Sequence, residues 1–282
     1  MQKNKACIII PVYKHISNKN EILSLVQGLK IFRKHPIFFI CPESLDLSFT
    51  SKFTDQDSII KLEMFEDGYF KNVNSYNKLL LSKKFYERFS NYKFMMIYQL
   101  DAYVFEDQLD YWCNKNFDFI GAPWFKKFDT TGREKEFIPV AGNGGFSLRN
   151  ISKINSLMKQ KLSFNQMINL RNILAKSRTQ SHKNLIFTIG FFANFFCKTN
   201  SFAEICNYIC KHSTPPHEDY FFASTLPKIF PSFRSASAEE AIPFAFEVQA
   251  ENLYKMNGNK LPFGCHAWEK YSTDFWKKFI GF

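Results

Sequence analysis

Short apolar runs alternate with helical patterns along the first 124 residues, and this alternation limits the fold more than any other feature. Each run is rich in β-branched or aromatic residues and ends at proline or polar residues, as buried strands do. Helices are predicted over 21–35, with Asn20 as the N-cap, and over 74–89. This alternation predicts an α/β fold with a mainly parallel central sheet flanked by helices. The predicted strands are ACIIIPVY (6–13), IFFICPE (37–43), SIIKLEM (58–64), KFMMIYQLDAYVF (93–105) and FDFIGAPW (117–124).

The second half of the chain is less regular. PVAGNGGFSLRN (139–150) predicts a glycine-rich turn within extended structure, and residues 151–211 are mostly helical in pattern. The chain has no internal repeat and no low-complexity linker, so we expect a single domain over 1–282 with a helical insertion at 151–211. An apolar island at 184–196 would pack on the domain, form a dimer contact or dock on lipid.

The charge of the chain is strongly basic, with 37 Lys and Arg against 26 Asp and Glu and a net charge of +11. These basic residues are scattered in pairs rather than gathered in a block, which argues against a nucleic-acid-binding arm. A basic surface favours an anionic ligand or an anionic membrane leaflet. A polyanion-binding protein would also need exposed aromatic residues near clustered Lys and Arg, but here the aromatic residues lie largely in apolar runs.

The seven cysteines form no metal-ligand spacing and no disulfide framework. Cys7, Cys41 and Cys265 lie in strand-like context, and Cys206 and Cys210 are four residues apart on a predicted helix. We therefore expect no structural zinc and a reduced, cytoplasmic protein. The N-terminal apolar run is too short for a signal peptide, and no stretch is long enough for a membrane-spanning helix.

Asp101 ends the long apolar run that begins at residue 93. A lone ionised carboxylate is costly to bury unless another group pairs with it. In parallel sheets, ligands collect beyond the carboxyl ends of the strands. Because residues 11–13, 41–43 and 99–101 all fall at the ends of strand patterns, we expect Asp101 at the rim of a ligand crevice.

Four motifs follow one another along the chain: Gln99-Leu100-Asp101, Gly142–Gly145, His217-Glu218-Asp219 and Gly264-Cys265-His266. Taken singly, each has an ordinary structural explanation as a turn, a helix start or a core histidine. In this order they resemble glycosyltransferases of the A-type nucleotide-sugar fold (GT-A). QLDAYVF, FDFIGAPW, GNGGFSLR, HEDYFF and LPFGCHAWEKY more narrowly resemble a bacterial family of capsule and lipopolysaccharide gene clusters, formerly described only as a domain of unknown function. The resemblance covers residues 5–150 and 213–270.

This resemblance implies a divalent cation, Mn²⁺ or Mg²⁺, held by Asp101 and His266. Gln99 stands where the family fold has the first acidic residue of an Asp-x-Asp motif, and its amide can still hydrogen-bond a ribose or donor sugar. Asp219 is the expected general base, with Glu218 orienting the acceptor or sharing that role.

The expected nucleotide-sugar contacts come from strand ends, one helix start and the glycine turn: Pro11, Val12, Tyr13, Glu43, Tyr76, Asn77, Gln99, Asp101, Gly144 and Gly145. The expected acceptor contacts are Trp124, Glu247 and Trp268. For the aromatic residues in both sets, packing in the core is the alternative.

The resemblance as a whole implies an inverting, metal-dependent glycosyltransferase. It would move a sugar from a nucleoside diphosphate sugar, UDP-linked, to an oligosaccharide or lipid-linked acceptor in surface polysaccharide synthesis. We expect a cytoplasmic protein, peripheral on the inner face of the membrane, with no nucleic-acid partner. One alternative is a nucleotidyltransferase, which would need a second carboxylate near Asp101 that neither Gln99 nor Tyr103 supplies. The other is a non-catalytic sugar-binding or polyanion-binding protein.

Overall fold

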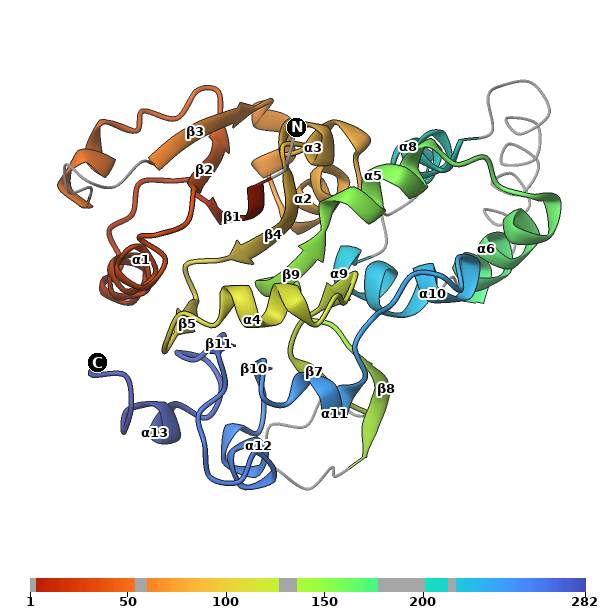
Figure 1. Cartoon of the computed structure of the whole chain (residues 1–282). Coiled ribbons are helices and arrows are strands. Elements are labelled where there is room, and N and C mark those ends of the chain that lie inside the picture. The colour runs from red at the N-terminus through yellow and green to blue at the C-terminus, as the bar shows by residue number, and fades with distance from the viewer. Residues whose placement is uncertain (1–3, 54–59, 127–135, 177–200, 213–216) are drawn as a thin grey trace.

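A six-stranded sheet with the order β3-β2-β1-β4-β9-β6 forms the centre of the fold (Figure 1). The structure, a computed structural model, describes residues 4–53, 60–126, 136–176, 201–212 and 217–282. Strands β1 to β4 pair in parallel, whereas β9 runs antiparallel between β4 and β6. The predicted α/β fold with a mainly parallel sheet is therefore confirmed.

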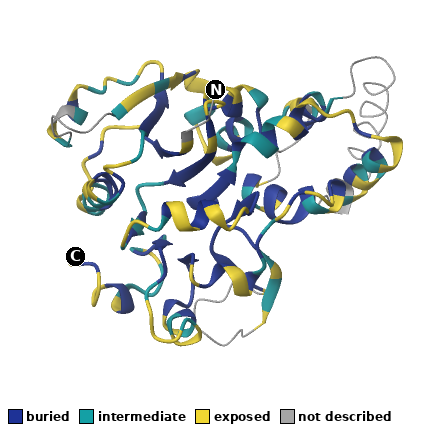
Figure 2. Ribbon diagram, in the orientation of Figure 1, coloured by how far each residue is buried: buried dark blue, intermediate teal, exposed yellow. Residues whose placement is uncertain are grey.

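The strands of this sheet are β1 (Asn4–Pro11), β2 (Ile37–Pro42), β3 (Ile60–Phe65), β4 (Tyr92–Tyr98), β6 (Phe119–Ile120) and β9 (Phe146–Asn150). Alternate residues of β1 enter different cores, with Cys7 and Ile9 in one cluster and Ile8 and Ile10 in the other. Because both faces are covered, the inner strands are buried along most of their length (Figure 2), which explains their apolar runs.

The helices of the first half are α1 (Lys19–Ile31), α2 (Val73–Leu80), α3 (Lys83–Arg88) and α4 (Leu109–Asn114), with 3₁₀ turns η1 (Ser48–Phe53) and η2 (Asp67–Phe70). Asn18, not the predicted Asn20, caps α1, because its side chain accepts a hydrogen bond from the Asn20 backbone N–H. The single helix predicted over 74–89 is two helices. Ser82 adopts an extended backbone between them and its hydroxyl accepts from Phe85 N, which starts a new helix.

The run predicted as one strand over 93–105 is also divided. After β4, Gln99 N donates to Gly145 O (2.8 Å) and Ala102 N donates to Gln99 O (2.9 Å), which closes a tight turn. The chain then enters β5 (Ala102–Val104), which belongs to a separate sheet of order β10-β11-β5. Asp101 therefore lies in a turn between two sheets. The partner strands are β10 (Ala245–Phe246) and β11 (Gly264–His266).

The run predicted as one strand over 117–124 is divided in the same way. Its first part is β6, and its second part is β7 (Pro123–Phe125), which pairs with β8 (Phe137–Ala141) in a two-stranded sheet. The chain returns from β8 to the central sheet through residues 142–145, so the glycine turn links these two sheets.

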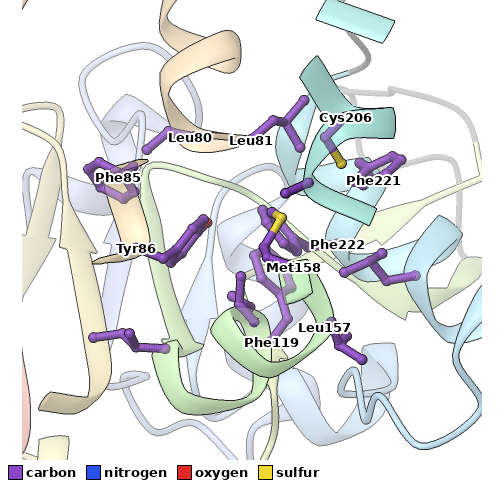
Figure 3. Packing of buried hydrophobic residues seen from close by; sticks show 14 of the residues in the cluster. Leu80, Leu81, Phe85, Tyr86, Phe119, Leu157, Met158, Cys206, Phe221 and Phe222 are labelled. Carbon is purple, nitrogen blue, oxygen red and sulfur yellow. The ribbon is translucent and has the colours of Figure 1, made fainter. Parts of the chain in front are cut away.

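The described residues of the predicted insertion are mostly helical, as α5 (Ile151–Lys159), α6 (Phe164–Lys176) and α8 (Phe202–His212). Met158 of α5 and Cys206 of α8 share one buried cluster with Phe119 and Phe222 (Figure 3). This helical part is thus continuous with the core of the sheet. The apolar island at 184–196 lies outside the described residues.

The last part of the chain contains several short helices. They are α9 (Glu218–Tyr220), a π-helical turn η3 (Phe221–Thr225), α10 (Leu226–Ile229), α11 (Ala238–Ala241), α12 (Ala250–Met256) and α13 (Thr273–Trp276). Of these, α12 and α13 share a third buried cluster with the small three-stranded sheet, and Trp268 and Trp276 anchor it. Each of the six cysteines within the described residues is free, and all but Cys210 are buried.

Candidate functional site

Asp101 meets His266 at the junction of the two sheets. The antiparallel pairing of β11 with β5 places His266 opposite Ala102, one residue beyond Asp101. As a result, His266 Nε2 lies 3.1 Å from Asp101 Oδ1, although the two residues are 165 positions apart in the chain. The structure therefore brings together both residues that the sequence suggested as metal ligands.

Asp101 and His266 each shift the pKa of the other in the direction that favours its charged form. Burial alone would raise the pKa of Asp101, but the adjacent His266 lowers it below its usual value. Burial likewise opposes a charged imidazole, yet the carboxylates of Asp101 and Glu247 outweigh it and raise the pKa of His266 to about 10. In the absence of another cation, a protonated His266 thus balances the two carboxylates.

The other ring nitrogen of His266 faces two further side chains. His266 Nδ1 lies 3.2 Å from Glu247 Oε1 and 3.0 Å from Asn143 Nδ2. Glu247 is 8% exposed. The sequence suggested an acceptor contact for Glu247, but the structure places it behind the imidazole, on the side away from Asp101.

The glycine turn allows close approach between the chain and these side chains. A Cβ at Gly145 would overlap His266 Nε2 and lie 2.7 Å from Gln99 Oε1. A Cβ at Gly144 would overlap the carboxylate of Glu218. Any larger residue at these two positions would displace the side chains of the site. Gly144 and Gly145 therefore lie at the site, as the sequence suggested, and Gln99 borders the same side of the turn as His266.

Asp219 faces this turn from the start of α9. Its Oδ2 accepts a hydrogen bond from Gly144 N (3.2 Å), and its Oδ1 accepts from Tyr220 N (2.7 Å). Burial and the neighbouring charge of Glu218 raise the pKa of the Asp219 carboxyl to about 7. A half-buried carboxyl with a pKa in this range is suited to accept a proton near neutral pH.

Glu218 is occupied differently from Asp219. Its Oε1 lies 2.7 Å from Arg149 Nη2, and both side chains are buried. Arg149 also donates toward Tyr86 Oη (3.3 Å), and its guanidinium lies over the ring of Phe222, 5.6 Å from the centroid. Because the partner of Glu218 is a buried arginine, its carboxylate holds the start of α9 against β9.

A cavity of about 440 Å³ opens beside Asp101, at the carboxyl ends of β1 and β4. Six of the predicted nucleotide contacts line it: Pro11, Val12, Tyr13, Tyr76, Gln99 and Asp101. Glu43 is exposed and does not line the cavity, and Asn77 is buried on α2 without lining it. The cavity lies where the parallel-sheet rule predicts a ligand crevice.

Other residues of the cavity and site were not predicted from the sequence. Lys14 and Lys71 bring cationic side chains to the cavity wall. Lys14 directly follows the predicted strand-end contacts, so its position was a usable signal. Arg149 also had a signal, because an arginine inside a strand needs a charged partner when it is buried. Asn143 had no signal beyond its place in the glycine turn.

The two predicted acceptor tryptophans have different surroundings. Trp124, on β7, is half-buried, and its ring stacks with that of the exposed Tyr220, at 6.1 Å between centroids. Tyr220 directly follows Asp219. Trp268, by contrast, is fully buried, donates from Nε1 to Ala102 O and packs against Phe282. Its ring faces are closed to a sugar.

Asp101 and His266 fit a divalent cation that has few protein ligands. His266 Nε2 is buried and makes no hydrogen bond with any described residue, although Asp101 Oδ1 lies 3.1 Å away. A nitrogen and an oxygen bound to adjacent positions of an octahedral ion would lie about 3 Å apart. Within the described residues, no group of three or more His, Cys, Asp or Glu side chains is arranged to hold a metal. A cation here would therefore take its remaining ligands from water or a bound phosphate.

None of the described helices combines the length and the apolar character needed to cross a bilayer.

Comparison with solved structures gives distant likenesses. The chain is similar to core-mannan synthase A from Aspergillus fumigatus, in its Mn/GDP form, with a TM-score of 0.36 and 10% identity over 53% of this chain and 60% of that chain. It is also similar to HddC from Yersinia pseudotuberculosis, with a TM-score of 0.34 and 10% identity over 53% of this chain and 79% of that chain. The match thus spans less than two thirds of core-mannan synthase A, and likenesses at this level assign no activity.

Comparison with known sequences gives a family. No curated protein matches the chain. A family model described as "Protein of unknown function (DUF5672)" matches residues 59–266. The matched segment contains Asp101, the glycine turn, Asp219 and His266. Because the model covers more than half of the 282 residues, the chain belongs to this DUF5672 family.

Proposed function

We propose that the protein is a GT-A glycosyltransferase that uses a nucleoside diphosphate sugar, inverts the anomeric centre and depends on a divalent metal. The observation that carries the proposal is the convergence of Asp101, His266 and Asp219 on one glycine turn beside a cavity. One part of this group suits a cation and the other suits a proton acceptor. The resemblance of the motifs to GT-A enzymes agrees with this division.

The donor nucleotide is proposed to lie in the cavity at the ends of β1 and β4. Tyr13, which is 55% exposed, offers a ring face to the base. Lys14 and Lys71 provide positive charge for the diphosphate. Asp101 and His266 would hold Mn²⁺ or Mg²⁺, which when bound stabilises the negative charge of the leaving diphosphate. We propose a UDP-linked donor on the family resemblance.

Asp219 is proposed as the general base. In the reaction, the acceptor O–H gives its proton to the Asp219 carboxylate while the acceptor oxygen forms a bond to the anomeric carbon. The bond between that carbon and the diphosphate oxygen breaks, and its electron pair leaves with the diphosphate. Positive charge develops on the sugar ring during this step, as in glycoside hydrolysis. Attack from the face opposite the leaving group inverts the anomeric centre.

Trp124 and Tyr220 are proposed to bind the acceptor. Their stacked rings lie beside Asp219, and Tyr220 is 46% exposed. An aromatic face can cover the C–H face of a pyranose ring. We propose an oligosaccharide or lipid-linked acceptor of surface polysaccharide synthesis, with the basic chain peripheral on an anionic membrane. Co-sedimentation with anionic vesicles at low and physiological salt tests the membrane part, and absence of binding at both would reject it.

An assay of donor turnover tests the proposal. The protein is incubated with a panel of UDP-sugars and GDP-sugars, with Mn²⁺, with Mg²⁺ or with chelator. A glycosyltransferase releases nucleoside diphosphate in the presence of metal. A nucleotidyltransferase would instead release pyrophosphate from a nucleoside triphosphate and a sugar phosphate. Tight binding without turnover of any donor or acceptor would leave only a sugar-binding protein and would reject the enzyme.

A further inference from the structure

The imidazole of His266 faces different partners at its two nitrogens. Nε2 faces Asp101, the proposed metal ligand, and makes no hydrogen bond with a described residue. Nδ1 faces Glu247 at 3.2 Å and Asn143 at 3.0 Å. A neutral imidazole protonates one nitrogen and leaves a lone pair on the other, so the partner at Nδ1 decides whether Nε2 can bind a metal.

Glu247 and Asn143 favour opposite protonation states of Nδ1. The orientation of the Asn143 amide is fixed, because its Oδ1 accepts from Gly145 N (3.0 Å) and Phe146 N (3.3 Å). Its Nδ2 therefore faces His266 and would donate to an unprotonated Nδ1. Glu247 is a carboxylate that can only accept while it is ionised, so it requires a proton on Nδ1.

The bond to Glu247 is the stronger of the two. A hydrogen bond to an ionised group is roughly twice as strong as one between neutral groups. Glu247 is also buried, and a buried carboxylate without a donor is more costly than an amide N–H without an acceptor. Both considerations keep a proton on Nδ1 when a cation takes the place of the proton on Nε2.

We propose that Glu247 is a positioning residue: its carboxylate accepts a hydrogen bond from Nδ1–H of His266 and so reserves the Nε2 lone pair for a divalent cation shared with Asp101. A carboxylate behind a metal-binding histidine commonly fixes both its tautomer and the orientation of its ring. This inference rests on the metal part of the proposed function, but the state of Nδ1 can be measured without any metal.

The first test is NMR of the metal-free protein above and below pH 10, because a doubly protonated His266 carries Hδ1 whichever partner faces it and only the neutral ring reports the preference. We expect a slowly exchanging Hδ1 signal at low field, assigned to His266 among the six histidines by its loss in His266→Asn. The signal should disappear in Glu247→Leu and persist in Glu247→Gln, whose amide oxygen can still accept. If the wild type has no Hδ1 signal, or if Glu247→Leu keeps it unchanged, Asn143 controls the ring and the inference fails.

The second test is Mn²⁺ affinity, measured by EPR titration in the presence of uridine diphosphate. We expect Glu247→Leu to weaken Mn²⁺ binding by about 10-fold to 100-fold, the usual scale for losing such a partner. Glu247→Gln should fall between Glu247→Leu and wild type. The matched control is Glu251→Gln, which removes a carboxylate of the same chain segment that is exposed; it should bind Mn²⁺ like wild type.

The combined outcomes separate this inference from the proposed function. One outcome is that the wild type does not bind Mn²⁺ but has an Hδ1 signal that depends on Glu247. This outcome would reject the metal site, and with it the role of Nε2 as a metal ligand. The hydrogen bond between Nδ1–H and Glu247 would stand. Normal Mn²⁺ binding in Glu247→Leu would overturn the inference alone and leave the metal assignment intact. An equal loss in Glu251→Gln would show a general charge effect, which also overturns it.

Discussion

Asp101 and Asp219 are two carboxylates near the same glycine turn, yet their pKa values move in opposite directions. His266 lies against Asp101 and lowers its pKa despite burial. Among the described residues, none forms an ion pair of this kind with Asp219, and burial together with Glu218 raises its pKa to about 7. Arg149, a cation whose charge reaches Asp219, is already paired with Glu218.

This difference assigns a different chemistry to each carboxylate. A carboxylate that stays ionised over a wide pH range suits a permanent cation, and one that titrates near neutrality suits proton transfer. Paired groups whose surroundings separate their pKa values are a common sign of divided roles in an active site. The following predictions test the division, beginning with the largest effect.

Asp101→Ala and His266→Ala should each abolish metal-dependent binding of a UDP-sugar, because each removes one of the two proposed protein ligands. The fold should persist, since Asp101 lies in a turn and His266 at the end of a short strand. Calorimetric titration with and without Mn²⁺ measures this. Asp110→Asn, which changes an exposed carboxylate, is the control. Unchanged affinity in both alanine variants would show that Asp101 and His266 do not hold the metal.

Arg149→Met should lower the free energy of unfolding by about 3–5 kcal/mol, because it leaves the Glu218 carboxylate buried without its partner. The control is Arg88→Met, which breaks the partly exposed pair with Glu63 and should cost about 0–1 kcal/mol. The double variant Arg149→Met/Glu218→Met should recover much of the loss. Urea denaturation measures the free energy of unfolding of each variant. Equal decreases in Arg149→Met and Arg88→Met would contradict a stabilising role for the buried ion pair.

Asp219→Asn should lower turnover by roughly 100-fold or more, the usual scale for loss of a general base. Donor affinity should stay close to wild type, because Asp219 does not line the cavity. Glu218→Gln should have a milder effect on turnover and a larger effect on stability. Steady-state kinetics with one acceptor measure this. Normal turnover in Asp219→Asn, with a large loss in Glu218→Gln, would move the base to Glu218.

The pH profile sharpens the same assignment. A general base must be unprotonated, so wild-type activity should fall as the pH drops through about 7, where Asp219 gains its proton. Asp219→Asn should show low activity without this acidic limb. The measurement is turnover at saturating donor across the pH range in which the protein stays folded. An acidic limb that persists in Asp219→Asn would belong to another group.

The smallest expected effect is an opposite pH dependence of stability at the two carboxylates. The folded pKa of Asp219 lies above its unfolded value of about 4, so its contribution is fully present at lower pH and is lost as the pH rises toward 7. The folded pKa of Asp101 is lowered, so its contribution is present above about pH 4 and is lost as the pH falls.

Chemical denaturation of the metal-free protein at several pH values measures both slopes. The stability difference between wild type and Asp219→Asn should shrink from about pH 4 to 7. The difference between wild type and Asp101→Asn should instead grow as the pH rises through the unfolded pKa of about 4. Slopes of the same sign would mean that the two sites do not differ in the way described.

The central sheet was predictable from the sequence because its signals are local. The apolar runs at 6–13 and 37–43 end at proline and polar residues, and the structure places strands there. Breaks inside a run were harder to predict. The turn after Tyr98 depends on a hydrogen bond from Gln99 N to Gly145 O, so nothing near Gln99 in the sequence marks it.

The sequence by itself determined the α/β sheet, and the resemblance carried by its ordered motifs suggested that Asp101, the glycine turn, Asp219 and His266 share one site. Only the tertiary structure decided what each side chain faces. The register of β11 against β5 turns His266 toward Asp101, and the same fold puts Glu247 behind it and buries Trp268. The physical reason is that spacing along the chain fixes local conformation, whereas burial and charge pairing depend on distant segments that meet only in the folded molecule.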